Sequence, residues 1–163
     1  MKRHISAAGL ALAALAVLGL AGPVAAGEQV PFKGSLDGVV TITPLNPPFL
    51  SVLVDATGNA TQLGQFTLDI PHVVNRATRA ATGTYEFTAA NGDKVYAEFT
   101  GLAMPTATPG VLYIEETATI TGGTGRFAGA TGSFTVERLY DTVNGETKGS
   151  FEGTITLGGD DDD

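Results

Sequence analysis

The stretch TGGTGRFAGATGSF, at residues 121–134, places five glycines between two runs of residues that favour β-strands. Glycine adopts positive φ without strain and lets neighbouring backbone approach closely, so the stretch is typical of a tight connection. Residues 126–128 (Arg-Phe-Ala) are long enough for one helical turn within that connection. We expect this turn to cap one end of a barrel, with Phe127 as the side chain that closes it.

Eight segments of the chain are rich in Thr, Val, Ile, Phe and Tyr and are separated by Gly, Pro and Asn, which is typical of strands joined by turns. Residues 57–59 (Thr-Gly-Asn) and 91–92 (Asn-Gly) are interpreted as tight turns, the second of type I′. No segment after residue 26 has the period of an amphipathic helix. The predicted strands are Val30–Ile42, Leu50–Ala56, Ala60–Val73, Ala80–Ala89, Lys94–Ala103, Val111–Thr121, Gly132–Asp141 and Thr147–Leu157.

Apolar and polar residues alternate along these segments, as they do when one face of an antiparallel sheet packs and the other faces water. In the fifth segment, for example, Val95, Ala97 and Phe99 share one face. Successive strands with short turns predict an all-β fold, a closed eight-stranded antiparallel up-and-down barrel, because closure removes exposed strand edges. A β-sandwich is the alternative. The outward faces carry Lys, Glu, Asp and Thr, so they lack the lipid-facing apolar band of an outer-membrane barrel.

The first 26 residues have the pattern of a cleavable secretory signal peptide. Lys2 and Arg3 give a positive start, residues 10–20 form an apolar run, and residues 24–26 (Val-Ala-Ala) are small enough for signal peptidase. The apolar run is too short for a stable membrane anchor, and we expect no membrane span after signal cleavage. These features predict a secreted or periplasmic protein.

Composition limits the partners of the chain. There are 17 Asp and Glu against 9 Lys and Arg, a formal net charge of −8. This excess of acid gives no electrostatic reason to expect binding to nucleic acid or to anionic lipid. The absence of cysteine removes disulfides, thiol catalysis and thiolate metal sites. We predict three parts, namely the signal peptide, a barrel domain at 27–158 and an acidic disordered tail at 159–163.

The glycine-rich stretch resembles the signature of the allene oxide cyclase-like and dirigent-like barrel proteins. Residues 58–67 (GNATQLGQFT) are similar to the GxATHLGxxT stretch of small secreted bacterial members. The resemblance covers most of residues 30–157 and implies an eight-stranded antiparallel barrel with an apolar lumen. Plant members bind fatty-acid epoxides or phenoxy radicals and steer cyclisation or coupling. A homo-oligomer, a dimer or a trimer, is compatible with the resemblance.

Two departures from the family pattern bear on activity. Gln62 stands where the bacterial pattern has histidine. The cysteine that plant cyclases use in their pocket has no counterpart in this chain. The resemblance therefore implies a barrel with a lumen and does not imply the cyclase reaction.

Motifs for cofactors, metals and nucleophilic catalysis are incomplete. Residues 123–128 (GTGRFA) fit the GxGxxA dinucleotide fingerprint, but a predicted strand follows where that motif needs a helix. His72 is the only histidine after residue 26 and has no cluster of further metal ligands around it. No serine lies in a GxSxG elbow. We predict no cofactor and no metal, and we interpret His72 as a strand-end residue.

One pair of charged residues falls on otherwise apolar strand faces. Glu116 shares its face with Ala118, and Arg138 shares its face with Val136. If residue 116 lies opposite 136, the two charges are diagonal neighbours within reach of each other, whereas a bulge would put either one outside. Buried charges need a partner or a wet pocket, so we predict a polar anchor point in the lumen. The predicted ligand-binding residues are Gln62, Phe66, Phe99, Glu116, Phe134, Arg138 and Phe151.

Three functions are compatible with these observations. The first is a secreted or periplasmic protein that binds a small apolar ligand in its lumen without catalysis, through apolar walls and a few polar groups. The second is an isomerase or cyclase that confines a reactive lipid or phenolic intermediate, with Glu116 as the candidate catalytic carboxylate. The third is a structural extracellular protein whose own side chains fill the barrel.

Overall fold

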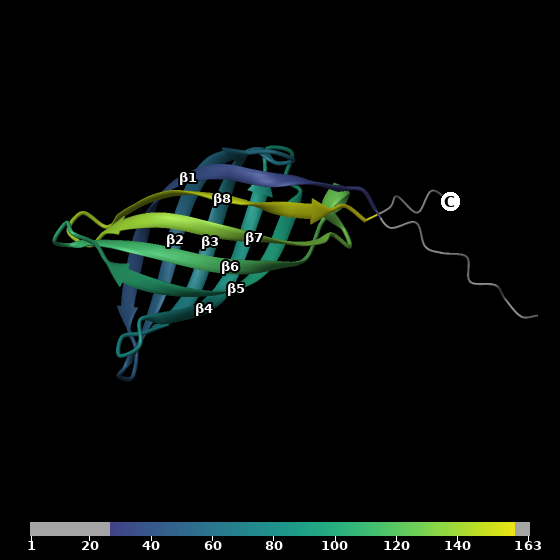
Figure 1. Ribbon diagram of the computed structural model, residues 1–163. Helices are drawn as coiled ribbons and strands as arrows, with labels where there is room; N and C mark the ends of the chain where they lie inside the picture. Colours follow the sequence, from purple (N-terminus) through teal and green to yellow (C-terminus); the bar gives the residue numbers. More distant parts are fainter. Residues whose placement is uncertain (1–26, 159–163) are drawn as a thin grey trace, which may run out of the picture.

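The computed structural model describes residues 27–158, which form one closed β-barrel (Figure 1). The signal peptide predicted for residues 1–26 and the tail predicted for 159–163 lie outside the described residues. Within the described part, no helix is long and apolar enough to cross a membrane. The elements are β1 (Gln29–Pro44), β2 (Phe49–Ala60), β3 (Gly64–Asn75), β4 (Ala80–Ala89), β5 (Lys94–Pro105), β6 (Val111–Gly123), the 3-10 turn η1 (Gly125–Phe127), β7 (Thr131–Asp141) and β8 (Glu146–Thr156).

Each strand is antiparallel to the strand before it, and β1 pairs with β8 to close the barrel. Gly34 of β1, for example, lies between Ala60 of β2 and Phe151 of β8. Since every strand has a partner on both sides, no edge is left for pairing with another chain. The predicted closed eight-stranded antiparallel barrel is confirmed, and the sandwich is excluded.

The turn predicted at residues 57–59 is wrong. These residues continue β2, which runs to Ala60, and the chain turns at residues 61–63 instead. Gly58 is required there for close packing, because a Cβ at this position would lie 2.6 Å from Cζ of the Phe66 ring. A glycine inside a strand often marks such a close approach and not a turn.

The type I′ turn predicted for residues 91–92 is also wrong. Gly92 has a φ of 91°, but Asn91 is not among the residues with positive φ, and a type I′ turn needs positive φ at both. Residues 90–93 join β4 to β5, and the N–H of Gly92 donates to the carbonyl oxygen of Ala89 at 2.9 Å.

Aromatic side chains fill the middle of the barrel. Rings from five strands meet there in edge-on and tilted contacts, with neighbouring ring centroids 5.2–6.1 Å apart. Such buried pairs each contribute about 0.5–1.5 kcal/mol beyond the burial of their area. This phenylalanine cluster consists of Phe32, Phe66, Phe87, Phe134 and Phe151.

One end of the barrel is closed by η1, the green turn at the right of Figure 1. Phe127 is fully buried there, and Leu63 and Ala130 belong to the same buried core. The N–H of Phe127 donates to the carbonyl oxygen of Thr124 at 3.0 Å. Gly123 leaves room for this turn, because a Cβ at that position would lie 2.7 Å from Cβ of Phe127. The glycine-rich connection therefore caps the barrel as predicted, and we call this end the plugged end.

The opposite end is formed by the four loops at residues 45–48, 76–79, 106–110 and 142–145, and we call it the open end. The inward-facing side chains nearest these loops are only half-buried, unlike those of the phenylalanine cluster. They are Val40, Leu50, Val74, Ala81, Ala103, Leu112, Ile114 and Tyr140. Solvent therefore reaches the mouth of the barrel at this end, down to the level of these side chains.

Candidate functional site

The predicted pairing of Glu116 with Arg138 is confirmed. Glu116 lies opposite Val136 and Arg138 opposite Ile114, so the two charges are diagonal neighbours on the inner face. Arg138 donates from Nε to Oε2 of Glu116 at 3.1 Å and from Nη2 to Oε1 at 2.8 Å. Glu116 is 1% exposed and Arg138 is 3% exposed. The two parallel bonds form a bidentate ion pair, which suits the planar guanidinium.

Tyr85 and Thr147 complete the hydrogen bonding of this ion pair. The hydroxyl of Tyr85 donates to Oε2 of Glu116, and Nη1 of Arg138 donates to Oγ1 of Thr147 at 3.1 Å. Across residues 27–158, every buried side-chain nitrogen or oxygen has a hydrogen-bond partner. Full satisfaction of this kind is what allows two ions inside an apolar core. We call Tyr85, Glu116, Arg138 and Thr147 the polar cluster.

The polar cluster shifts the titration of its own members. Burial, together with the negative charge of Glu116, raises the pKa of Tyr85 well above its ordinary value. Burial alone would lower the pKa of Arg138, but the hydrogen bonds and the charge of Glu116 outweigh it and raise that pKa. Tyr85 therefore stays a neutral hydrogen-bond donor at neutral pH, and Arg138 stays a cation.

His72 lies on β3 toward the open end and is 8% exposed. Its Nδ1 is 2.9 Å from the carbonyl oxygen of Ile70, which only accepts, so Nδ1 carries the hydrogen. Nε2 makes no hydrogen bond to the described residues, and since every buried polar atom there has a partner, Nε2 contacts solvent. Burial lowers the pKa of His72, so the ring is neutral at pH 7 and Nε2 is a hydrogen-bond acceptor.

Phe99 connects His72 to the polar cluster. Its ring centroid lies 5.6 Å from that of His72 and 4.9 Å from that of Tyr85. The charges of Arg138 and Glu116 act on His72 in opposite senses, the first lowering and the second raising its pKa. The imidazole and the ion pair therefore occupy the same part of the barrel, between the phenylalanine cluster and the open end.

The predicted aromatic site residues fall into two places. Phe99 borders His72 and the polar cluster, as described above. Phe66, Phe134 and Phe151 belong to the phenylalanine cluster, where their rings pack against one another and leave the middle of the barrel filled. Contact between a ligand and any of these residues stays a prediction.

Gln62, which was predicted as a ligand-binding residue together with Glu116 and Arg138, does not lie beside that ion pair. It lies in the turn between β2 and β3 with a φ of 65°, at the plugged end. Its Oε1 accepts a hydrogen bond from Nη2 of Arg126 at 3.1 Å. The prediction fails because β3 begins at Gly64 and not at Ala60, so residue 62 lies in the turn before the strand.

Three residues of the site were not identified from the sequence. Tyr85 and Thr147 bond to the ion pair from β4 and β8, and His72 lies beside it on β3. Strand alternation carries a signal for His72, since it continues the inward face of Leu68 and Ile70. The hydrogen bonds of Tyr85 and Thr147 to the ion pair are not predictable from strand alternation, because they depend on the curvature of the closed barrel.

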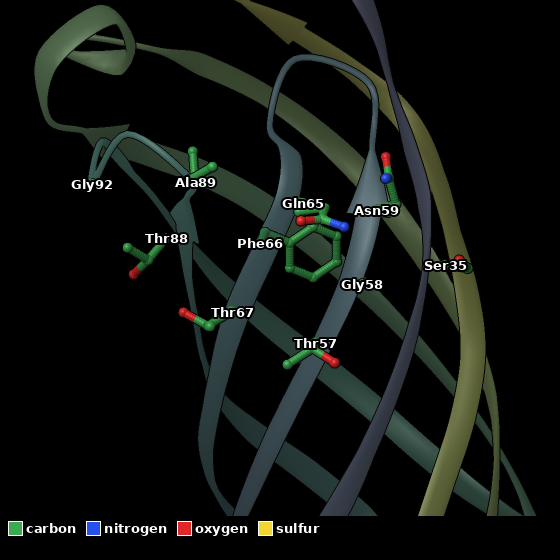
Figure 2. A pocket seen from close by; sticks show the side chains of 11 residues that line it. Ser35, Thr57, Gly58, Asn59, Gln65, Phe66, Thr67, Thr88, Ala89 and Gly92 are labelled. Carbon is green, nitrogen blue, oxygen red and sulfur yellow. The ribbon is translucent and has the colours of Figure 1, made fainter.

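A hollow on the outer surface is a second candidate, but it has fewer groups that could recognise a ligand. Figure 2 shows a hollow on the barrel wall near the plugged end, lined by Thr57, Gln65 and Thr67 together with Thr88 of β4. Its lining contains no charged side chain. No group of three or more His, Cys, Asp or Glu side chains placed to hold a metal ion occurs within residues 27–158. The interior polar cluster with His72 is therefore the candidate site.

Comparison with known proteins adds the fold relationship. No protein-family model matches the sequence, and no curated protein matches it. The structure of the pterocarpan synthase dirigent protein GePTS1 superposes with a TM-score of 0.56 and 13% identity, over 85% of this chain and 90% of that one. The pterocarpan synthase dirigent protein PsPTS1 superposes with a TM-score of 0.57 and 11% identity, over 81% of this chain and 97% of that one. The chain therefore has a dirigent-like closed eight-stranded β-barrel fold.

Proposed function

We propose that the protein is an exported, non-catalytic binding protein for a small apolar molecule that carries one hydrogen-bond donor such as a hydroxyl group. The ligand enters at the open end, and its donor group bonds to Nε2 of His72. The observation that carries this proposal is the acceptor at Nε2 of His72, which has no partner among the described residues, on a ring that packs beside Phe99.

The walls of the open end suit the apolar part of such a ligand. Half-buried aliphatic side chains, among them Leu50, Val74 and Ile114, face inward there. Transfer of apolar surface from water onto these side chains stabilises the complex by about 25 cal/mol for each Å² buried. A few polar groups at the base of apolar walls are the usual composition of a small-molecule site.

The polar cluster supports binding more than catalysis. Both carboxylate oxygens of Glu116 already accept hydrogen bonds, from Arg138 and Tyr85. A general acid or base needs a position within hydrogen-bond reach of the reacting group, and this carboxylate is occupied instead. Glu116 and Arg138 therefore act as a fixed support beneath His72, and the cyclase hypothesis receives no support from Glu116.

The proposal is tested with 1-naphthol and its methyl ether, which have similar apolar surface and differ in the hydroxyl donor. We expect 1-naphthol to bind, as measured by its fluorescence, and the ether to bind about ten-fold more weakly, as one lost hydrogen bond implies. His72→Phe should abolish the difference, while His72→Gln, which keeps an acceptor, should retain part of it. Equal binding of the two compounds would overturn the assignment of His72. Binding of neither would favour the filled structural barrel.

A further inference from the structure

Exposed apolar side chains gather at one end of the barrel. Each large hydrophobic residue of the described chain that is strongly exposed lies in an open-end loop or on the strand leading into one. Exposed apolar residues scattered singly are ordinary, but their concentration at one end of the barrel is a feature that interaction surfaces share. These residues are Val39, Ile42, Leu45, Phe49, Leu53, Val73, Leu102, Leu139 and Val143.

Acidic side chains are absent from most of the end of the barrel where the exposed apolar side chains lie. Residues 38–54, 70–85 and 99–114, which form three of the four open-end loops and their strands, contain no Asp or Glu. Their only Lys or Arg residues are Arg76 and Arg79. The chain as a whole has a formal net charge of −8, so its acidic excess belongs to other parts of the chain. These open-end segments are therefore apolar and locally positive, although the net charge of the chain is negative.

Two loops bring these features together. The N–H of Arg76 donates to the carbonyl oxygen of Pro48 at 2.9 Å, which ties the loop at 76–79 to the loop at 45–48. Figure 1 shows the two loops projecting side by side at the lower left, away from η1. We call residues 45–49 and 76–79 the arginine lobe. Leu45 and Phe49 are 44% and 43% exposed within it.

The arginines of this lobe have no acidic neighbour to neutralise them. Neither Arg76 nor Arg79 takes part in any of the three ion pairs found within residues 27–158. The fourth loop differs, because Asp141 and Glu146 flank residues 142–145. Among the four loops of the open end, the arginine lobe is therefore the one with an excess of positive charge.

We infer that the arginine lobe docks the open end of the barrel onto an anionic lipid surface. Leu45 and Phe49 enter the boundary between headgroups and acyl chains, while Arg76 and Arg79 bond to lipid phosphates. A second copy related by a two-fold axis is a poorer occupant, since it would set the arginines of one lobe against the same arginines of the other. Docking also turns the accessible end of the barrel toward a source of apolar molecules.

The inference is tested by co-sedimentation of the barrel protein with vesicles of phosphatidylcholine, with and without phosphatidylglycerol. We expect binding to the anionic vesicles only, weakening as salt is added. Each arginine contributes about five-fold to the partition coefficient, so Arg76→Ser/Arg79→Ser should lower it by about 25-fold. Leu45→Ser/Phe49→Ser should also weaken binding. The matched control, Lys33→Ser/Arg126→Ser, removes the same charge near the plugged end and should leave binding within about two-fold of the original.

Three outcomes would overturn the inference. They are absence of binding to anionic vesicles, binding that the arginine-lobe variants leave unchanged, and equal loss in the control. Sedimentation velocity without lipid tests the competing occupant, which is a second copy of the chain. If the protein does not bind vesicles but self-associates, and Phe49→Ser abolishes the self-association, the arginine lobe is an interface between copies. Thermal melts of each variant show that the fold is intact. The naphthol experiment uses no lipid, so docking and ligand binding fail or succeed separately.

Discussion

Arg138 makes three hydrogen bonds to side chains inside the barrel, two to Glu116 and one to Thr147. Removal of one ion leaves the other buried without its partner, which typically costs about 3–5 kcal/mol. Glu116→Gln is therefore expected to lower the free energy of unfolding by about that amount, measured by urea denaturation.

The matched control removes both charges together. Glu116→Gln/Arg138→Met leaves no unpaired ion, so it is expected to lose less stability than Glu116→Gln alone. A single variant that loses less than about 1 kcal/mol, or a double variant that loses more than the single one, would contradict this account of the ion pair.

A row of carboxylates on the outer face gives a second prediction for single residues. Asp55, Asp69 and Glu86 lie opposite one another on β2, β3 and β4. Partial burial, the hydrogen bond with Asp55 and the charges of Asp55 and Glu86 raise the pKa of Asp69 above its ordinary 3.8. The stability that Asp69 contributes is thus fully present below pH 3.8 and is lost as pH rises through the raised pKa. Asp69→Asn should therefore stabilise the protein slightly at pH 7, by less than about 0.5 kcal/mol because solvent screens charges on this exposed face, and have no such effect near pH 3.

Denaturation of the Asp69→Asn variant at both pH values checks this expectation. Asp37→Asn is the control, because Oδ1 of Asp37 pairs with Nζ of Lys148 at 3.1 Å on the surface. The same substitution there removes an attraction, so it should be neutral or slightly destabilising at pH 7. Destabilisation by Asp69→Asn at pH 7 would contradict the repulsion between these carboxylates.

The residues of the site differ in how far the sequence predicts them. Glu116 and Arg138 lie on adjacent strands joined by a short connection, so a correct register was enough to predict their pairing. His72 and Tyr85 lie on β3 and β4, and they approach the ion pair only because the sheet closes on itself. The pattern of a single sequence predicts contacts between adjacent strands, but it does not predict contacts that depend on closure of the barrel.

At the level of elements, the connection through η1 gives a prediction about glycine. A Cβ on Gly123 would lie 2.2 Å from the carbonyl oxygen of Lys94 and 2.7 Å from Cβ of Phe127. Gly123→Ala must therefore displace the plug or the strand, and we expect a loss of about 1–3 kcal/mol in thermal or urea denaturation.

Gly129→Ala is the comparison for this substitution. Gly129 has a φ of 69°, and apart from its chain neighbours no atom lies within 4 Å of the position a Cβ would take, so alanine there meets backbone strain alone. We expect that strain to cost about 1 kcal/mol. If Gly129→Ala proves the more damaging of the two, close packing of η1 is not what requires glycine at position 123.

The elements themselves were largely predictable from two-residue alternation. Ala80–Ala89 is predicted with the bounds the structure has, and its inward and outward residues alternate from Ala81 to Ala89. The end of β2 was misjudged at Thr57-Gly58-Asn59, where turn-forming residues occur inside a strand. Gly58 is there to admit the Phe66 ring, and packing of that kind depends on a neighbouring strand.

At the level of the whole molecule, the two ends of the barrel have different roles. The phenylalanine cluster and the plug at Phe127 fill one half and supply the packing that a chain without cysteine needs. The other half holds the polar cluster and His72 beneath half-buried apolar walls. Stability and the proposed binding are therefore separated along the barrel axis.

The central claim is that a hydroxyl-bearing apolar molecule binds at the open end beside His72. Titration of isotope-labelled protein with 1-naphthol, followed by amide and imidazole NMR shifts, locates binding residue by residue. We predict shifts at Nε2 of His72 and at the amides of Ile114 and Tyr140, with the amide of Phe127 unmoved. Shifts confined to the outer wall around Thr57, or no shifts at all, would contradict the claim.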